Sequence, residues 1–261
     1  MAKLLSERRG PVTVLTINRA DVHNCVDGET AAALATSIDA FARDPSARVL
    51  VVTGAGDKSF CSGADLKHAY TLMSHEWVER AGPMGFARLD AGKPTIAAVN
   101  GYCFAGGFEL AAWCDFRVAA ANAEFGALNR RWGVPFTDGG TQRFARIMGQ
   151  GNALYMIETG VRVDVERALA MGFVQEIVPA GQALTRALEL AERIAGYPNA
   201  SIVADRAATL ATCGLSLRDG LRFEAENCLP TGADAEMAAG LERFVSHDRP
   251  DAPRPPAKGK A

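Results

Sequence analysis

The sequence predicts an α/β core followed by an all-helical C-terminal region. Two observations lead to this fold class. Through the first part of the chain, short apolar runs typical of buried strands alternate with segments of helical apolar spacing. After about Gly196 the apolar residues recur at helical spacing only. We therefore expect an α/β core at residues 1–195, a helical region at residues 196–246 and a frayed tail at residues 247–261.

Five apolar runs are expected to form the strands of the core. Residues 12–17 alternate in the manner of a half-buried strand. Residues 48–53 are almost continuously apolar, which is typical of a strand covered on both faces. The three other runs with this character are residues 95–99, 116–119 and 173–178. Strands that alternate with helices in this way are typical of α/β units.

Helices are expected between and after these strands. Asp27 is placed to cap a helix that ends before Pro45. The inner face of that helix carries Leu34, Ile38 and Phe41, at spacings of four and three residues. Further helices are predicted at residues 164–171, which begin with an aspartate cap, and at residues 199–213, 217–228 and 233–245.

Composition and charge exclude several classes of protein. The chain has 261 residues, of which 48% are hydrophobic and 22% charged, as in an ordinary globular protein. Lys and Arg number 28 against 30 Asp and Glu, so no overall basic field attracts nucleic acid or an anionic membrane. No apolar run approaches the roughly 20 residues that span a bilayer. We expect a protein that binds neither nucleic acid nor a membrane.

The cysteine and histidine patterns indicate neither disulfides nor a metal site. The six cysteines show no CxxC or metal-type spacing, and the four histidines lack ligand spacing. A chain of this size needs no disulfides for stability, so the thiols are expected to be small core residues. The N-terminal residues lack the apolar segment of a signal peptide. We therefore expect a cytoplasmic protein without a metal ion.

Three glycine-rich stretches follow strand-like runs. The first, residues 51–59, fails both nucleotide-binding templates, because Asp57 stands where a phosphate loop needs glycine and Ser59 where a dinucleotide fingerprint needs one. In the other two, residues 59–67 and 97–110, small residues leave backbone N–H groups uncovered where a helix can begin. Such groups can hold an oxygen that gains negative charge. Glycine-rich turns alone, however, are more typical of helix caps.

The third stretch also contains an unusual carboxylate. Glu109 falls in the first turn of a predicted helix, among the apolar residues Phe108, Leu110 and Ala111. A glutamate in such surroundings is costly unless it is hydrogen-bonded or functional. Glu109 is therefore a candidate catalytic residue.

These segments resemble the crotonase superfamily, which contains the enoyl-CoA hydratases and isomerases. Residues 62–67, SGADLK, match the first oxyanion motif of that family. Residues 93–111, KPTIAAVNGYCFAGGFELA, match the second motif. The similarity continues in order from about Val12 to Val245. It implies a crotonase-like spiral of ββα units whose helical C-terminal region packs homotrimers, often paired as hexamers. It also implies an acyl-CoA thioester substrate, so that coenzyme A is part of the substrate and no separate cofactor is needed.

The resemblance assigns roles to individual residues. It places the thioester oxygen on the backbone N–H groups of Ala64 and Gly106, with Glu109 as the acid/base group. Two lysines match positions near the phosphates of coenzyme A, although both can equally be solvated surface charges. A third basic position of the family falls on Asp21, and Arg19 is its candidate substitute. The candidate residues for binding coenzyme A are Lys58, Lys67, Arg19, Ser62, Asp65 and Leu66.

One position departs from the hydratases of this family. They carry a second glutamate four residues after a Phe-Gly pair, where this chain has Asn129. An amide does not exchange protons as a carboxyl group does, but it can hold a water or a carbonyl group. Asn129 is therefore a candidate site residue of altered role.

Another carboxylate, Asp138, follows in the next loop. Some isomerases of the family carry an aspartate in this loop, but their alignment places it at Thr137. We favour a cap for the helix expected at residues 139–148 as the role of Asp138, and keep a catalytic role as the alternative.

The expected function is that of an enoyl-CoA hydratase-like lyase that stabilises an enolate in an oxyanion hole. Retention of Glu109 favours hydration, because the familiar isomerases keep the second carboxylate and not the first. An enoyl-CoA isomerase or another CoA lyase of the same fold is the alternative. A non-catalytic acyl-CoA-binding relative is a further alternative.

Overall fold

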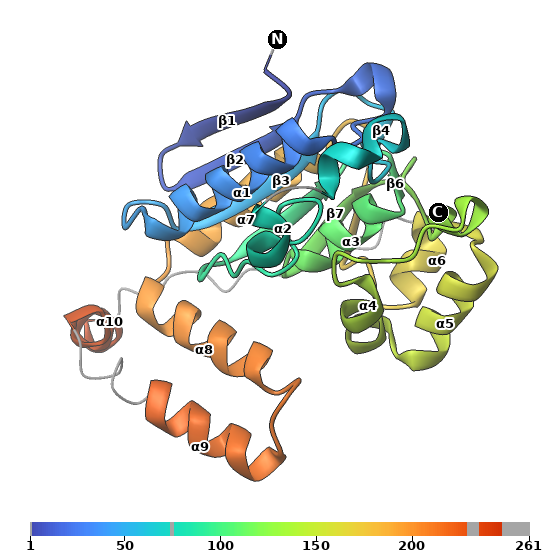
Figure 1. Cartoon of the computed structure of the whole chain (residues 1–261). Coiled ribbons are helices and arrows are strands. Elements are labelled where there is room, and N and C mark those ends of the chain that lie inside the picture. The colour runs from blue at the N-terminus through green and yellow to red at the C-terminus, as the bar shows by residue number, and fades with distance from the viewer. Residues whose placement is uncertain (1, 74–75, 229–234, 247–261) are drawn as a thin grey trace. The chain divides into compact units, whose positions relative to one another are not determined.

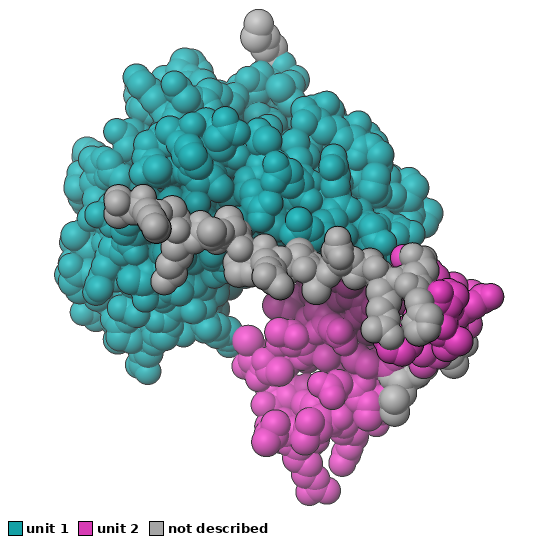
Figure 2. All heavy atoms as spheres, turned by 180° about the vertical axis from the view of Figure 1, so that it is seen from behind, with its two compact units in different colours: residues 1–197 teal, residues 198–261 magenta. Residues whose placement is uncertain are grey.

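The computed structural model describes residues 2–73, 76–228 and 235–246 (Figure 1). The chain divides after Tyr197 into two compact units, coloured teal and magenta in Figure 2. The predicted order of an α/β core and a helical region is confirmed. The expected tail at residues 247–261 and the expected first turn of the last helix, residues 233–234, lie outside the described residues. No helix in the described part of the chain is long and apolar enough to cross a membrane.

The first unit contains a six-stranded sheet. Its order is β1-β2-β3-β5-β7-β10, with β1 antiparallel to β2 and all other neighbours parallel. The strands are β1 (Leu4–Arg9), β2 (Val12–Ile17), β3 (Val49–Gly54), β5 (Thr95–Val99), β7 (Phe116–Ala120) and β10 (Glu176–Val178). Within the run at residues 173–178 only the last three residues form a strand, and Phe173 and Val174 before it are buried in the hydrophobic core.

A second sheet of four short strands follows the order β4-β6-β8-β9. Its strands are β4 (Ser59–Cys61), β6 (Tyr102–Phe104), β8 (Glu124–Gly126) and β9 (Arg162–Asp164). The chain visits the two sheets in turn, since β3, β5 and β7 of the first sheet are followed by β4, β6 and β8 of the second. This alternation is the repeated turn of a spiral. Strands of three residues are too short for their pattern to predict them.

Helices α1 (Gly28–Arg43) and α7 (Ala183–Ala195) cover opposite faces of the first sheet (Figure 1). Residues of α1 share one core cluster with Leu15 of β2, whereas the alanines of α7 share another with Val14 of the same strand. The expectation that residues 12–17 are half-buried was therefore wrong, because both faces of β2 are covered. The predicted Asp27 cap is confirmed, since its Oδ1 accepts the Thr30 N–H at 3.0 Å.

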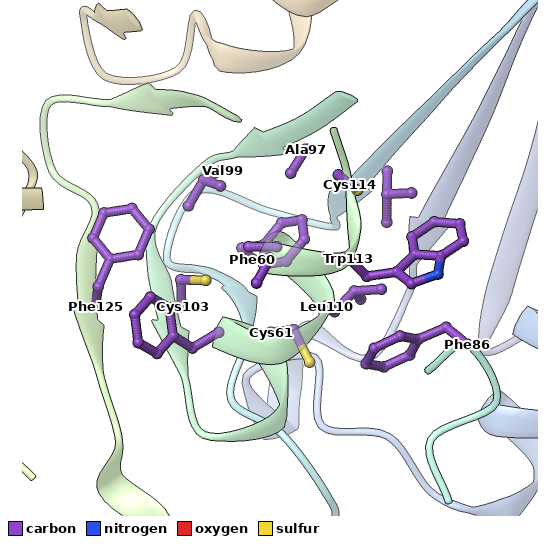
Figure 3. Close-up of a cluster of buried hydrophobic side chains, with 14 of the residues drawn as sticks. Phe60, Cys61, Phe86, Ala97, Val99, Cys103, Leu110, Trp113, Cys114 and Phe125 are labelled. Atoms are coloured by element: carbon purple, nitrogen blue, oxygen red, sulfur yellow. The ribbon is translucent and has the colours of Figure 1, made fainter. Parts of the chain in front are cut away.

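Helix α3 (Gly106–Trp113) is buried over its whole length. Figure 3 shows its Leu110 and Trp113 among apolar side chains of both sheets. Four further helices belong to the first unit: α2 (Glu76–Ala81), α4 (Gly140–Met148), α5 (Gln150–Thr159) and α6 (Val165–Ala170). Three 3₁₀ helices are η1 (Ala20–Val22), η2 (Leu66–Leu72) and η3 (Leu128–Trp132). Asp164 caps α6 as predicted, by accepting the Arg167 N–H at 2.8 Å.

The second unit contains the helices α8 (Asn199–Ala211), α9 (Leu217–Cys228) and α10 (Ala235–Val245). No described residue of α9 or α10 is buried. Large apolar side chains on these helices are instead exposed, among them Leu217, Leu221, Leu241 and Phe244.

Candidate active site

A cavity of about 590 Å³ lies in the first unit where three strands of the second sheet end. The segments that follow β4, β6 and β8 all contribute to its wall, together with the loop before α4. The predicted site residues that line it are Ala64, Gly106, Glu109, Asn129, Asp138, Arg19, Ser62, Asp65, Leu66 and Lys67. Lys58 does not line it, but lies exposed between β3 and β4. Apolar lining comes from Leu128, Trp132, Val134 and Phe136.

Two backbone N–H groups of this cavity wall are without hydrogen-bond acceptors. Hydrogen bonds made by its neighbours hold Ala64 in place, from Val26 N–H to Gly63 O and from Asp65 N–H to Val26 O, both at 2.8 Å. Gly106 is the first residue of α3, where an N–H has no acceptor within the helix. Within the described residues, neither Ala64 nor Gly106 donates a backbone hydrogen bond. Both donors are thus available to a ligand oxygen.

Glycine at position 63 allows these two segments to approach each other. Gly63 has a φ of +90°, and a Cβ there would lie 2.7 Å from the nitrogen of Gly106. No side chain fits between the two backbones without moving one of them. Ala105, just before α3, also has a positive φ of 51°, which turns the chain into the helix.

Glu109 extends from the first turn of α3 and is only 3% exposed. Its Oε1 accepts the Asp138 N–H at 2.9 Å and the Gly140 N–H at 2.8 Å. Burial raises the pKa of this carboxyl to about 8, and the negative charge of Asp138 adds to the shift, although the two backbone donors oppose it. Near neutral pH Glu109 therefore carries a proton in the free protein.

Asp138 does not cap α4, so the favoured interpretation was wrong. The residue before α4 is Gly139, whose φ of 93° directs the chain into the helix without a side-chain cap. The Oδ1 of Asp138 instead accepts the Met84 N–H at 2.9 Å. Burial raises the pKa of Asp138 to about 6, although the Met84 N–H and nearby arginines oppose the shift. We call Glu109 and Asp138 the carboxyl pair.

Asn129 is buried in the wall of the same cavity as the carboxyl pair. Its Nδ2 donates to the Val134 carbonyl oxygen at 2.8 Å, which fixes the orientation of the amide because that oxygen only accepts. Its Oδ1 is buried and has no hydrogen-bond partner among the described residues. The amide thus helps to hold the loop that leads to Asp138.

Arg19, expected near the phosphates of coenzyme A, is bound to two carboxylates. Its guanidinium lies 2.9 Å from Asp65 Oδ2 and 3.3 Å from Asp27 Oδ2, and it also donates to the Cys25 carbonyl oxygen. We call Arg19, Asp27 and Asp65 the Arg19 cluster. Burial alone would raise the pKa of Asp65, but hydrogen bonds from Arg19 and His68 outweigh it and the pKa is lowered. The positive charge of Arg19 is therefore already balanced within the protein.

Sequence reasoning missed Met84, which links the parts of this site. Its N–H binds Asp138, and its Sδ would lie 2.2 Å from a Cβ on Gly106. Met84 lies in a loop without hydrophobic periodicity, so no sequence signal points to it. No group of three or more His, Cys, Asp and Glu side chains in the described part of the chain could hold a metal ion.

A protein-family comparison decides the ancestry of this arrangement. The family model for enoyl-CoA hydratase/isomerase matches residues 7–252. The chain belongs to the enoyl-CoA hydratase/isomerase family. Carnitinyl-CoA dehydratase from Salmonella arizonae is 36% identical over 220 residues, covering 83% of each protein. Crotonyl-CoA hydratase from Syntrophomonas wolfei is 32% identical over 236 residues, covering 89% of this chain and 87% of that protein.

Solved structures of this family share the fold of the chain. An enoyl-CoA hydratase from Mycobacterium tuberculosis has a TM-score of 0.90 at 31% identity, covering 96% of this chain and 98% of that chain. A carnitinyl-CoA hydratase from Mycobacterium avium has a TM-score of 0.77 at 32% identity, covering 95% and 97%. The predicted crotonase-like fold is confirmed, and the protein is an enzyme of the enoyl-CoA hydratase/isomerase family.

Proposed function

We propose that this protein is an enoyl-CoA hydratase-type lyase, which reversibly adds water across the C2–C3 double bond of an enoyl-CoA thioester. One observation carries the proposal: the buried carboxyl of Glu109 lines the same cavity as two backbone N–H groups that have no acceptor among the described residues. The names of two relatives, a carnitinyl-CoA dehydratase and a crotonyl-CoA hydratase, also denote loss or gain of water on a CoA thioester.

In the proposed reaction, the N–H groups of Ala64 and Gly106 bind the thioester oxygen. When the oxygen of water bonds to C3, the electron pair of the double bond moves toward this carbonyl and forms an enolate. The two donors stabilise the charge that develops there, and loss of one such donor typically costs about 10²–10³ in rate. Water loses one proton, C2 gains one, and Glu109 is the acid/base group for this transfer.

The proposed substrate class is an acyl-CoA, with coenzyme A as part of the substrate. The apolar lining of the cavity from Leu128, Val134 and Phe136 suits an acyl chain. Lys67 is exposed beside the cavity and is the remaining lysine candidate for a phosphate contact, because Lys58 does not line it. Arg19 contributes little net charge to such a contact, since two carboxylates balance it.

We further propose that the chain assembles as a homotrimer, or as a hexamer of paired trimers. The exposed apolar side chains of α9 and α10 support this assembly, because contact with a second copy of the chain would remove them from water. Sedimentation equilibrium measures the assembly state, and a stable monomer would contradict the proposal.

Glu109→Gln tests the proposed function. The amide retains the size of the side chain and an acceptor oxygen for the Asp138 and Gly140 N–H groups, but it removes the proton-transfer group. With crotonyl-CoA, followed by loss of the ultraviolet absorbance of the conjugated thioester, we expect kcat to fall by about 10²–10⁴. The dissociation constant for the unreactive analogue butyryl-CoA should change little.

Glu124→Gln is the matched control. Glu124 undergoes the same chemical change, but it pairs with Arg162 and does not line the cavity. Its kcat should equal that of the unmodified enzyme. An unchanged kcat in Glu109→Gln would remove Glu109 from the proposed reaction.

The second candidate function is double-bond isomerisation of an enoyl-CoA. The carboxyl pair favours it, because two neighbouring carboxyls can carry a proton between C2 and C4. A product of unchanged mass with a shifted double bond would support isomerisation, whereas a 3-hydroxyacyl-CoA would support hydration.

A further inference from the structure

Three carboxyl side chains line the cavity, and two of them have no cationic partner in the described part of the chain. Asp65 is paired with Arg19 at 2.9 Å, whereas Glu109 and Asp138 bind only neutral donors. The nearest arginine of α4, Arg143, donates to the backbone oxygens of Asp138 and Ala87 and to neither carboxylate. Burying two carboxyls without a direct ion pair is costly, so the cost needs an explanation.

The geometry links Glu109 to the backbone of Asp138. The backbone N–H of Asp138 donates to Glu109 Oε1, and the side chain of Asp138 is held by the Met84 N–H beside Gly106. A structural role as a helix cap is absent, since Gly139 occupies that position. The amide of Asn129 does not act as an acid or a base at neutral pH, and its NH₂ group donates a hydrogen bond to the Val134 carbonyl oxygen.

We infer that Asp138 is a second proton-transfer residue of this site and supplies the base that Asn129 does not provide. The inference rests on the proposed hydratase reaction and deepens it. It divides the acid and the base between two different elements, α3 for Glu109 and the loop before α4 for Asp138.

The step balances with one water molecule. Asp138 accepts a proton from water as the water oxygen bonds to C3, while Glu109 releases its proton to C2 of the enolate. The product then leaves, and the proton on Asp138 returns to Glu109, so both carboxyls recover their starting states. Dehydration follows the same steps in reverse. The starting states match the pKa directions, since Glu109 is raised to about 8 and Asp138 to about 6.

The charged groups around the pair come from three segments. Arg143 of α4 and Arg88 of the loop after α2 stabilise the ionised form of Asp138, and Glu109 faces it from α3. Because Asp138 must be ionised, the rate should rise as the pH increases through about 6. Because Glu109 must be protonated, the rate should fall as the pH increases through about 8.

Two substitutions at one position test the inference. Asp138→Asn keeps an oxygen that can accept the Met84 N–H but exchanges no proton, whereas Asp138→Ala removes both properties. With crotonyl-CoA, we expect Asp138→Asn to lower kcat by about 10²-fold or more, while butyryl-CoA binds as before. The limb of the pH–rate profile near pH 6 should disappear, and the limb near pH 8 should move to lower pH, because Glu109 loses a negative neighbour.

The matched control is Asp164→Asn, since Asp164 also accepts a backbone N–H but lies outside the cavity. It should retain the kcat of the unmodified enzyme.

Full activity in Asp138→Asn with loss only in Asp138→Ala would assign Asp138 to holding Met84 and overturn the inference. If Glu109→Gln is inactive at the same time, the proposed function stands; if it is also fully active, that proposal falls too. Should neither Asp138 variant fold, a profile of the unmodified enzyme with one ionisation instead of two would overturn the inference.

Discussion

Asp65 and Asp138 are both buried aspartates in the wall of one cavity, yet the pKa of Asp65 is lowered and that of Asp138 is raised. Burial pushes both pKa values upward. The difference comes from their partners, because Asp65 binds Arg19 and His68 whereas Asp138 binds the neutral Met84 N–H. Burial alone therefore does not set the pKa of a carboxyl in this cavity; a direct ion pair with an arginine, present at Asp65 and absent at Asp138 within the described residues, decides the direction of the shift.

We therefore expect the Arg19 cluster and the carboxyl pair to have different roles. The Arg19 cluster connects the turn after β2 to the loop that carries Ala64, so it holds one of the two proposed oxyanion donors in place. The carboxyl pair connects α3 to the loop before α4 and keeps its titration near neutral pH. We expect changes in the Arg19 cluster to affect stability, and changes at the carboxyl pair or at the proposed oxyanion donors to affect turnover.

The largest effect in this comparison is expected for Gly63→Ala. The new Cβ would lie 2.7 Å from Gly106 N, so it displaces a backbone donor that the proposed reaction uses. We expect kcat for crotonyl-CoA to fall by about 10²–10³, with a loss of stability from the positive φ. Gly56→Ala is the control, because its φ is also positive, at +80°, but the nearest atom lies at an ordinary 3.6 Å. Equal kcat values in the two variants would contradict an oxyanion role for this segment.

A smaller effect on turnover, but a clear one on stability, is expected for Arg19→Gln. The substitution removes the arginine from Asp65 and leaves Asp27 with Lys3 as its cation. We expect the free energy of unfolding to fall by about 3 kcal/mol in urea titrations. The pKa of each aspartate is lower in the folded protein than in the unfolded chain, so the ionised carboxylates stabilise the fold at pH values above the unfolded pKa. This contribution is lost as the pH falls through the folded pKa. The deficit of the variant should therefore shrink in acid.

Arg8→Gln is the control for this stability effect. Arg8 pairs with Asp44 at 2.7 Å, but both side chains are more than a third exposed, at 35% and 39%. Such a surface pair contributes at most about 1 kcal/mol. A loss in Arg19→Gln as small as that in Arg8→Gln would show that the Arg19 cluster does not stabilise the fold.

The smallest effect is expected at the lysines. Lys67 lines the cavity and Lys58 does not, so Lys67→Ala should weaken butyryl-CoA binding by about two- to five-fold, as expected for an exposed charge contact. The weakening should diminish at high salt. Lys58→Ala should bind as the unmodified enzyme does. A larger loss in Lys58→Ala than in Lys67→Ala would place the phosphates of coenzyme A near Lys58, outside this cavity.

Long local patterns made much of the fold predictable from the sequence. Continuous apolar runs mark β3 and β5, and a single aspartate before each helix marks the start of α1 and α6. The strands of the second sheet were not predictable, because a strand of three residues is too short to show an alternation of apolar and polar side chains. The full burial of β2 was also missed, since it depends on α7, which lies more than 160 residues further along the chain.

For the site, contiguous motifs were informative and distant pairings were not. Ala64, Gly106 and Glu109 lie in the two short sequence motifs that resemble the oxyanion motifs of the family, and the structure brings all three residues to one cavity. The pairing of Arg19 with Asp65 joins residues 46 positions apart and has no local signal. Asp138 was misjudged because an aspartate just before a helix is commonly its cap, whereas here the Met84 N–H binds its side chain.

Solvent isotope incorporation tests the proposed reaction most directly. The purified enzyme is given crotonyl-CoA in deuterium oxide, and the product is analysed by mass spectrometry and proton NMR. The account predicts 3-hydroxybutyryl-CoA with one deuterium at C2 and none at C4, since C2 receives the proton from an acid that exchanges with solvent. Deuterium at C4 without a 3-hydroxyacyl product would contradict hydration and favour isomerisation.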